Sequence, residues 1–134
     1  MNWMKTGVLA MALAFCAAPA FAQGVNNLSG VWQGVFWGAG NTPTSFQITL
    51  RDDPGPGFSG STVETNNFGD VEAPFLLATL QGQVQGAQVS FVKTYDGTGS
   101  VSHSVSYRGR LVSDRRIVGT WSLDGASGPF EMAR

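Results

Sequence analysis

Alternation of apolar and polar side chains with a period of two runs through most of the chain, and this feature limits the possible folds most strongly. Phe46, Ile48 and Leu50 alternate with polar neighbours, and later segments repeat the pattern. Such alternation is typical of a strand with one buried face. No window after residue 28 places apolar residues at helical spacing for three turns. The pattern therefore predicts an all-β domain.

Turn segments rich in glycine and proline divide the chain into eight strand-like runs. The runs cover residues 31–37, 46–51, 58–63, 75–84, 89–95, 104–111, 117–123 and 130–134. Consecutive antiparallel strands joined by short turns form a meander, and eight of them lose their exposed edges by closing into an up-and-down barrel. We predict this antiparallel barrel, with an open sandwich as the alternative. The polar residues 65–74 are expected to form an irregular loop over one mouth.

The first 22 residues have the layout of a secretory signal peptide. Lys5 supplies a positive start, residues 7–18 form an apolar run, and Ala20 and Ala22 are small residues before a cut at Gln23. The apolar run is too short to span a hydrocarbon core of roughly 30 Å. We predict a signal peptide at residues 1–22, a single β-barrel domain at 23–134, and a secreted or periplasmic protein; an N-terminal membrane anchor is the alternative.

Composition excludes several function classes. The net charge of −1 gives no electrostatic reason to expect nucleic acid as a partner. The chain has one His and one Cys, and Cys16 lies in the predicted signal peptide behind the large Phe15, which argues against lipidation. Neither a metal site of ordinary type nor a disulfide is expected after residue 22. We predict no cofactor, no metal, no catalytic residues and no membrane span in the mature chain.

The opening strand contains Gly30-Val31-Trp32, which resembles the first strand of the calycin group of lipocalins, fatty-acid-binding proteins and avidins. In that group the Trp packs across the closed end of the barrel beside an Arg from late in the chain. Arg134 has the phase for this role, since it follows the apolar Phe130 and Met132 at even spacing. The resemblance thus implies a barrel with one sealed end.

Further short matches resemble the avidin type in particular. They lie at residues 90–93, 106–109, 116–121 and 128–130. The resemblance implies that Phe91, Tyr107 and Trp121 line a pocket. It does not extend to biotin, because residues 33–36 lack the Asn, Ser and Tyr side chains with which avidins hold the ureido group.

Register arithmetic brings candidate residues onto one face. In a hairpin around Thr98 and Gly99 whose opposite residue numbers sum to 198, Phe91 faces Tyr107 and Tyr95 faces His103. The next hairpin sums to 228 and sets Tyr107 opposite Trp121. The last hairpin is expected to pair Trp121 with Met132. Because a one-residue slip would turn these side chains to the other face, their agreement predicts a shared interior face.

That face is the candidate site. The residues predicted to bind a ligand are Trp37, Phe91, Lys93, Tyr95, His103, Tyr107 and Trp121. Aromatic walls with a few polar groups at one end are typical of small-molecule sites. A buried Lys93 would need an anion, either a carboxylate such as Glu64 or an acidic ligand. We predict a non-enzymatic barrel that binds a small, partly apolar molecule in its interior.

Two alternatives use the same strands differently. Large aromatic side chains can fill a small barrel completely. The chain would then be an interaction or self-assembling module whose outer surface, or loops at 52–57 and 65–74, contact a partner such as a second copy. A third hypothesis is an enzyme that uses Lys93, Tyr95 and His103.

Overall fold

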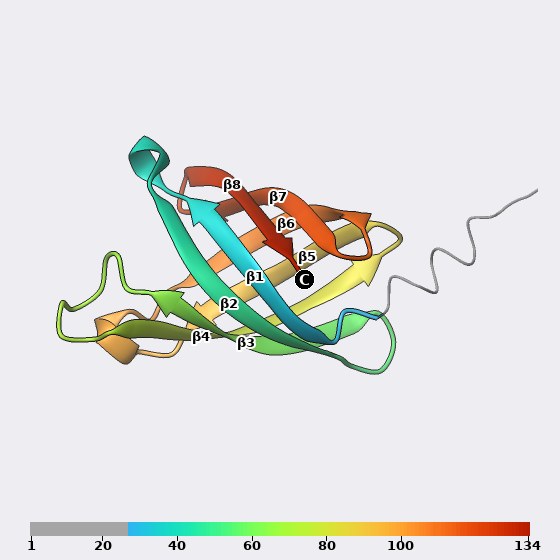
Figure 1. The fold of residues 1–134 in the computed structure, drawn as a ribbon, viewed down its shortest axis with the longest axis horizontal. Helices are drawn as coiled ribbons and strands as arrows, with labels where there is room; N and C mark the ends of the chain where they lie inside the picture. The colour runs from blue at the N-terminus through green and yellow to red at the C-terminus, as the bar shows by residue number, and fades with distance from the viewer. Residues whose placement is uncertain (1–26) are drawn as a thin grey trace, which may run out of the picture.

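The computed structural model describes residues 27–134, so the predicted signal peptide at 1–22 lies outside the described residues. Eight antiparallel strands follow one another around a closed barrel, and the last pairs with the first (Figure 1). The strands are β1 (Gly30–Trp37), β2 (Pro43–Asp52), β3 (Gly57–Thr65), β4 (Phe75–Gln85), β5 (Gln88–Tyr95), β6 (Ser104–Ser113), β7 (Arg116–Leu123) and β8 (Ala126–Ala133). The predicted all-β barrel is confirmed, and the open sandwich is wrong.

Short connections join the strands. Two of them contain single turns of 3-10 helix, η1 (Ala39–Asn41) and η2 (Thr98–Ser100). Within residues 27–134, no helix is long and apolar enough to cross a membrane.

Inward positions hold the core, as period-two alternation requires. In β5, buried and exposed residues alternate along the whole strand. Glycine at some inward positions lets the backbones of neighbouring strands approach closely. A Cβ atom at Gly119 would collide with the carbonyl oxygen of Arg108, and one at Gly82 would collide with that of Ser90. The strand register passes through Gly82 without a shift, so this glycine serves a close approach and not a bulge.

The registers of two predicted hairpins are confirmed. Between β5 and β6, Phe91 lies opposite Tyr107 and Lys93 opposite Val105. The backbone N–H of Tyr95 donates to the carbonyl of His103 at 3.0 Å, which continues that register. Between β6 and β7, Tyr107 lies opposite Trp121.

The predicted register of the β7–β8 hairpin is wrong. Trp121 lies opposite Gly128 rather than Met132, a difference of four residues. The cause is a two-residue turn at Asp124 and Gly125, whose φ angles of 49° and 86° are those of a type I′ turn. Because the difference is an even number, Met132 still points inward. The Asp-Gly pair is a strong hairpin signal, and the prediction gave it too little weight.

One end of the barrel is sealed by a Trp–Arg contact. Trp32 is fully buried, and the guanidinium carbon of Arg134 lies 4.5 Å from the centre of its ring. Arg134 also donates hydrogen bonds to the carbonyls of Asn27, Ser29 and Asp114. The contact expected from the calycin resemblance is therefore present.

The loop between β3 and β4, residues 66–74, lies against the other end. Asn67 donates to the hydroxyl of Thr44 on β2 at 2.8 Å, and Ser100 donates to Asp70 at 2.6 Å. The loop and the β5–β6 connection come together at the left of Figure 1. The ring of Phe68 packs edge-on against Tyr95, with 5.8 Å between ring centres. The loop thus covers part of this mouth, as predicted.

Candidate functional site

A polar cluster lies in the interior of the barrel. Lys93 donates to Glu64 at 2.7 Å, and both side chains are fully buried. The hydroxyl of Tyr95 reaches both carboxylate oxygens of Glu64, at 3.0 and 2.8 Å. The anion that a buried Lys93 requires is therefore supplied by the protein itself.

Strands β3 and β5, on either side of β4, bring this cluster together. Glu64 points inward from β3, and Lys93 and Tyr95 point inward from β5, with β4 between them. Tyr95 lies opposite Ala78 of β4. The small inward side chain of Ala78 allows the long side chains of the flanking strands to meet across it.

Four aromatic rings surround the Lys93 ammonium group. The distances from its nitrogen to the ring centres are 4.6 Å for Phe36 and Phe46, 4.8 Å for Tyr95 and 5.3 Å for Tyr107. The negative face of an aromatic ring attracts a cation at such distances. Carboxylate and rings together enclose the charge.

Burial changes the acid–base properties of this cluster. Loss of hydration lowers the pKa of Lys93, and the carboxylate of Glu64 opposes this change by favouring the ammonium form. Burial raises the pKa of both Tyr95 and Tyr107, and the nearby charge of Glu64 raises each further. Both phenols therefore stay protonated at neutral pH, which lets Tyr95 donate to Glu64.

A packed aromatic layer adjoins the cluster. Phe91 and Tyr107 stack with ring centres 4.7 Å apart and planes 9° from parallel. Phe130 meets both rings edge-on, at 5.9 and 4.9 Å. These three side chains are buried. Phe91 and Tyr107 thus share the interior face as predicted, and they pack against each other.

The end opposite Trp32 carries apolar side chains that are partly exposed. Phe36, Trp121 and Leu123 pack against the core but remain partly exposed. Phe36 and Trp121 meet edge-on at 6.3 Å, and the indole N–H of Trp121 donates to the carbonyl of Trp37 at 2.9 Å. We call the three side chains Phe36, Trp121 and Leu123 the apolar mouth.

Two predicted site residues lie outside the packed interior. Trp37 follows the inward Phe36 along β1, so its side chain takes the opposite face and only its backbone carbonyl reaches Trp121. His103 is exposed, and its ring lies 5.0 Å from that of Tyr95 and 6.3 Å from that of Phe68. His103 therefore belongs to the rim of the mouth.

Sequence reasoning missed three side chains near the cluster. Phe36 and Phe46 lie at even spacing from other inward residues on their strands, so period-two alternation could have identified both. Phe68 lies in an irregular loop, where no periodicity indicates which way a side chain points.

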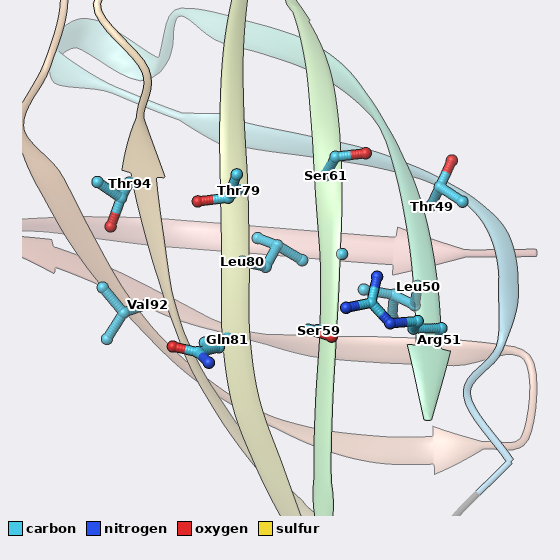
Figure 2. Close-up of a pocket in the computed structure, with 11 residues that line it drawn as sticks. Thr49, Leu50, Arg51, Ser59, Ser61, Thr79, Leu80, Gln81, Val92 and Thr94 are labelled. Atoms are coloured by element: carbon cyan, nitrogen blue, oxygen red, sulfur yellow. The ribbon is translucent and has the colours of Figure 1, made fainter. Parts of the chain in front are cut away.

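A hollow of about 640 Å³ lies on the outside of the barrel, across strands β2 to β5 (Figure 2). Among its lining residues, Thr49, Ser61 and Thr79 stand on neighbouring strands, and Arg51 supplies the charge. These four side chains are exposed. The hollow is open to solvent and contains no buried polar group that could orient a ligand.

No protein-family model matches the chain, and no curated protein matches it. Solved structures of designed barrels do match. A redesigned β-barrel, b11L5F_LGL, has a TM-score of 0.69 at 13% identity, over 85% of this chain and 95% of that one. The redesigned barrel mFAP1, described as bound to DFHBI, has a TM-score of 0.65 at 12% identity, over 85% and 97%. A fluorescence-activating β-barrel designed de novo has a TM-score of 0.61 at 11% identity, over 84% and 95%.

At these identities the likeness shows the fold alone. It supports an eight-stranded antiparallel closed barrel, and the avidin-type assignment stays a prediction.

Proposed function

We propose that this chain is a non-enzymatic barrel that binds a small, mostly apolar molecule at the apolar mouth. The observation that carries the proposal is the difference between the two ends. At one end Trp32 is fully buried beneath Arg134. At the other end Phe36, Trp121 and Leu123 leave apolar surface open to solvent around the same core. Apolar side chains with a few polar groups nearby are typical of the lining of a small-molecule site.

Each part of the mouth has its own role in this proposal. Phe36, Trp121 and Leu123 form the walls, and Phe68 and His103 form the rim on the side of the β3–β4 loop. Lys93, Glu64 and Tyr95 lie behind Phe36 and hold the floor in place. Phe91 and Tyr107 support this floor by stacking.

The fold likeness supports the proposal in one respect. A designed barrel of the same architecture is described as bound to the small dye DFHBI. The Trp32–Arg134 contact supports a calycin-like assignment, and residues 1–22 support export to a secreted or periplasmic location. The calycin-like assignment and the secreted or periplasmic location are both parts of this proposal.

A fluorescence titration tests the proposal. N-phenyl-1-naphthylamine is neutral and emits strongly when it leaves water, so we expect a saturable rise on titration with the protein. Phe36→Ala should weaken binding roughly tenfold, because losing about 1.4 kcal/mol of apolar contact has that effect. Phe75→Ala is the matched control, since Phe75 is an exposed residue of β4. Absence of saturable binding, or equal weakening by both changes, would contradict the proposal.

A second candidate function is self-association through the outside of β2 to β5. The outward positions of these strands carry a single charged side chain, Arg51, so two copies would not repel each other. Val63 and Leu77 lie opposite each other there, with Phe75 beside them, and all three are exposed. Sedimentation should then show a dimer that Leu77→Lys dissociates. A strict monomer at all concentrations would reject this function.

A further inference from the structure

The charge balance of the interior indicates what class of ligand the mouth accepts, an inference that rests on the proposed function. We infer that the ligand is uncharged, because Lys93 and Glu64 neutralise each other and the mouth offers no free charge to an acid or an amine. The pair supplies one positive and one negative group at 2.7 Å, and both are closed off from solvent.

Lys93 has no unmatched charge to offer an acidic ligand. The carboxylate of Glu64 holds one side of its ammonium group, and the rings of Phe36 and Phe46 each lie 4.6 Å from its nitrogen. An acid at the mouth would meet apolar walls and lose hydration without gaining a free cation. Removing a charge from water without a partner is strongly unfavourable.

The same argument applies to an amine. Glu64 already accepts hydrogen bonds from Lys93 and from Tyr95, and both members of the ion pair are fully buried. A ligand cation would therefore meet a carboxylate that is already neutralised. The pair thus offers no partner to a ligand of either charge.

Charged and titratable groups at the rim do not alter this balance. Asp70 accepts a hydrogen bond from Ser100, Asp96 accepts one from the backbone of Thr98, and the ring of His103 lies tilted against that of Tyr95. Asp124 follows the mouth residue Leu123, and Glu72 lies in the β3–β4 loop. All of these side chains are exposed, so water and salt screen them. The preference for an uncharged ligand therefore depends on the apolar walls and on the absence of a free buried charge.

Three naphthalene probes with a common ring system test the inference on the unaltered protein. They are 1-naphthalenemethanol, which is neutral, 1-naphthoate, an anion, and 1-naphthalenemethylammonium, a cation. We expect the alcohol to bind at least tenfold more tightly than either ion. If one ion binds best, the inference is overturned while the proposed function stands. If none of the three binds, the proposed function fails and the inference fails with it.

Charge-removing variants then test the role of the pair. Glu64→Gln leaves Lys93 without a counterion, so the naphthoate-to-alcohol affinity ratio should rise at least tenfold. Lys93→Met leaves Glu64 unmatched and should raise the ratio for the ammonium probe instead. The double variant Glu64→Gln/Lys93→Met should restore the preference for the alcohol. Unchanged ratios in folded single variants would overturn the assigned role of the pair. If a single variant does not fold, the three-probe comparison on the unaltered protein still tests whether the ligand is uncharged.

Discussion

Lys93 and Glu64 form an ion pair that is closed off from solvent on every side, at 2.7 Å, within a barrel otherwise filled largely by aromatic and aliphatic side chains. The pair joins β3 to β5 across β4. Because Tyr95 also donates to Glu64, the carboxylate has partners for both of its oxygens. The interior is therefore neutral overall, although each member is charged.

Removing one member of this pair should destabilise the protein far more than removing both. Lys93→Met or Glu64→Gln leaves a buried group without its partner, and each should lower the free energy of unfolding by about 3–5 kcal/mol. The double variant Lys93→Met/Glu64→Gln should recover most of that loss. Urea denaturation of the four proteins provides the comparison. If the double variant is less stable than either single variant, the pair is not coupled as described.

Alkaline pH should unfold the protein through its two tyrosines. Burial raises the pKa of Tyr95 and Tyr107 above the ordinary value of 10.0, so the unfolded chain loses these protons first. The stability contributed by the protonated tyrosines is complete below pH 10 and is lost as pH rises. Burial lowers the pKa of Lys93 from 10.5, so as pH approaches 10.5 from below, this group makes the stability rise with pH. Well above pH 10.5 Lys93 is deprotonated in both the folded and the unfolded state and no longer changes how stability depends on pH.

Well above pH 10.5 the free energy of unfolding should therefore fall by about 2.7 kcal/mol per pH unit, or about 1.4 for each tyrosine. The chain has only two Tyr residues, so tyrosinate absorbance should appear together with loss of the folded circular dichroism signal. Tyr107→Phe should halve the slope. Tyrosinate formation in the folded protein near pH 10 would contradict the burial argument.

Arg134 should stabilise the sealed end although it is the last residue of the chain. Arg134→Ala removes the contact with Trp32 and hydrogen bonds to three carbonyls, so we expect a loss of about 1–3 kcal/mol. Arg110, an exposed residue of β6, provides the matched control, and Arg110→Ala should change stability by less than about 0.5 kcal/mol. If Arg134→Ala and Arg110→Ala lower the thermal unfolding temperature equally, the contact between Arg134 and Trp32 contributes nothing to stability.

Thr62 should tolerate loss of its hydroxyl group. Its side-chain oxygen is buried and has no hydrogen-bond partner among the described residues. Thr62→Val should therefore raise the free energy of unfolding by about 1 kcal/mol. Thr44→Val, which breaks the hydrogen bond from Asn67, should lower it by a similar amount. A lower stability for Thr62→Val would indicate that the hydroxyl has a partner in solution.

Much of the barrel was predictable because its strands alternate strictly. The hairpin that sets Phe91 opposite Tyr107 followed from period two and a short turn, and the observed register agrees. A lone Lys93 on an apolar face requires an anion, which is why Glu64 could be anticipated. The β7–β8 register failed because it depends on the turn at Asp124, where a positive φ angle selects a two-residue connection.

The candidate site was less predictable, for physical reasons. Trp37 and Phe36 are adjacent and both aromatic, so composition does not tell which of them faces inward, and only the even spacing of Phe36 from the buried Trp32 does. Phe68 belongs to a loop held by side-chain hydrogen bonds such as that from Asn67 to Thr44. Bonds of that kind join distant parts of the chain and leave no periodic trace in the sequence.

The indole N–H signals of Trp32 and Trp121 in an NMR titration with 1-naphthalenemethanol test the central claim most directly, because these rings lie at opposite ends of the barrel. Binding at the apolar mouth should move the Trp121 signal in a saturable way and leave the Trp32 signal in place. A Trp121 signal that stays unchanged while the probe is added, or a shift confined to Trp32, would contradict the account.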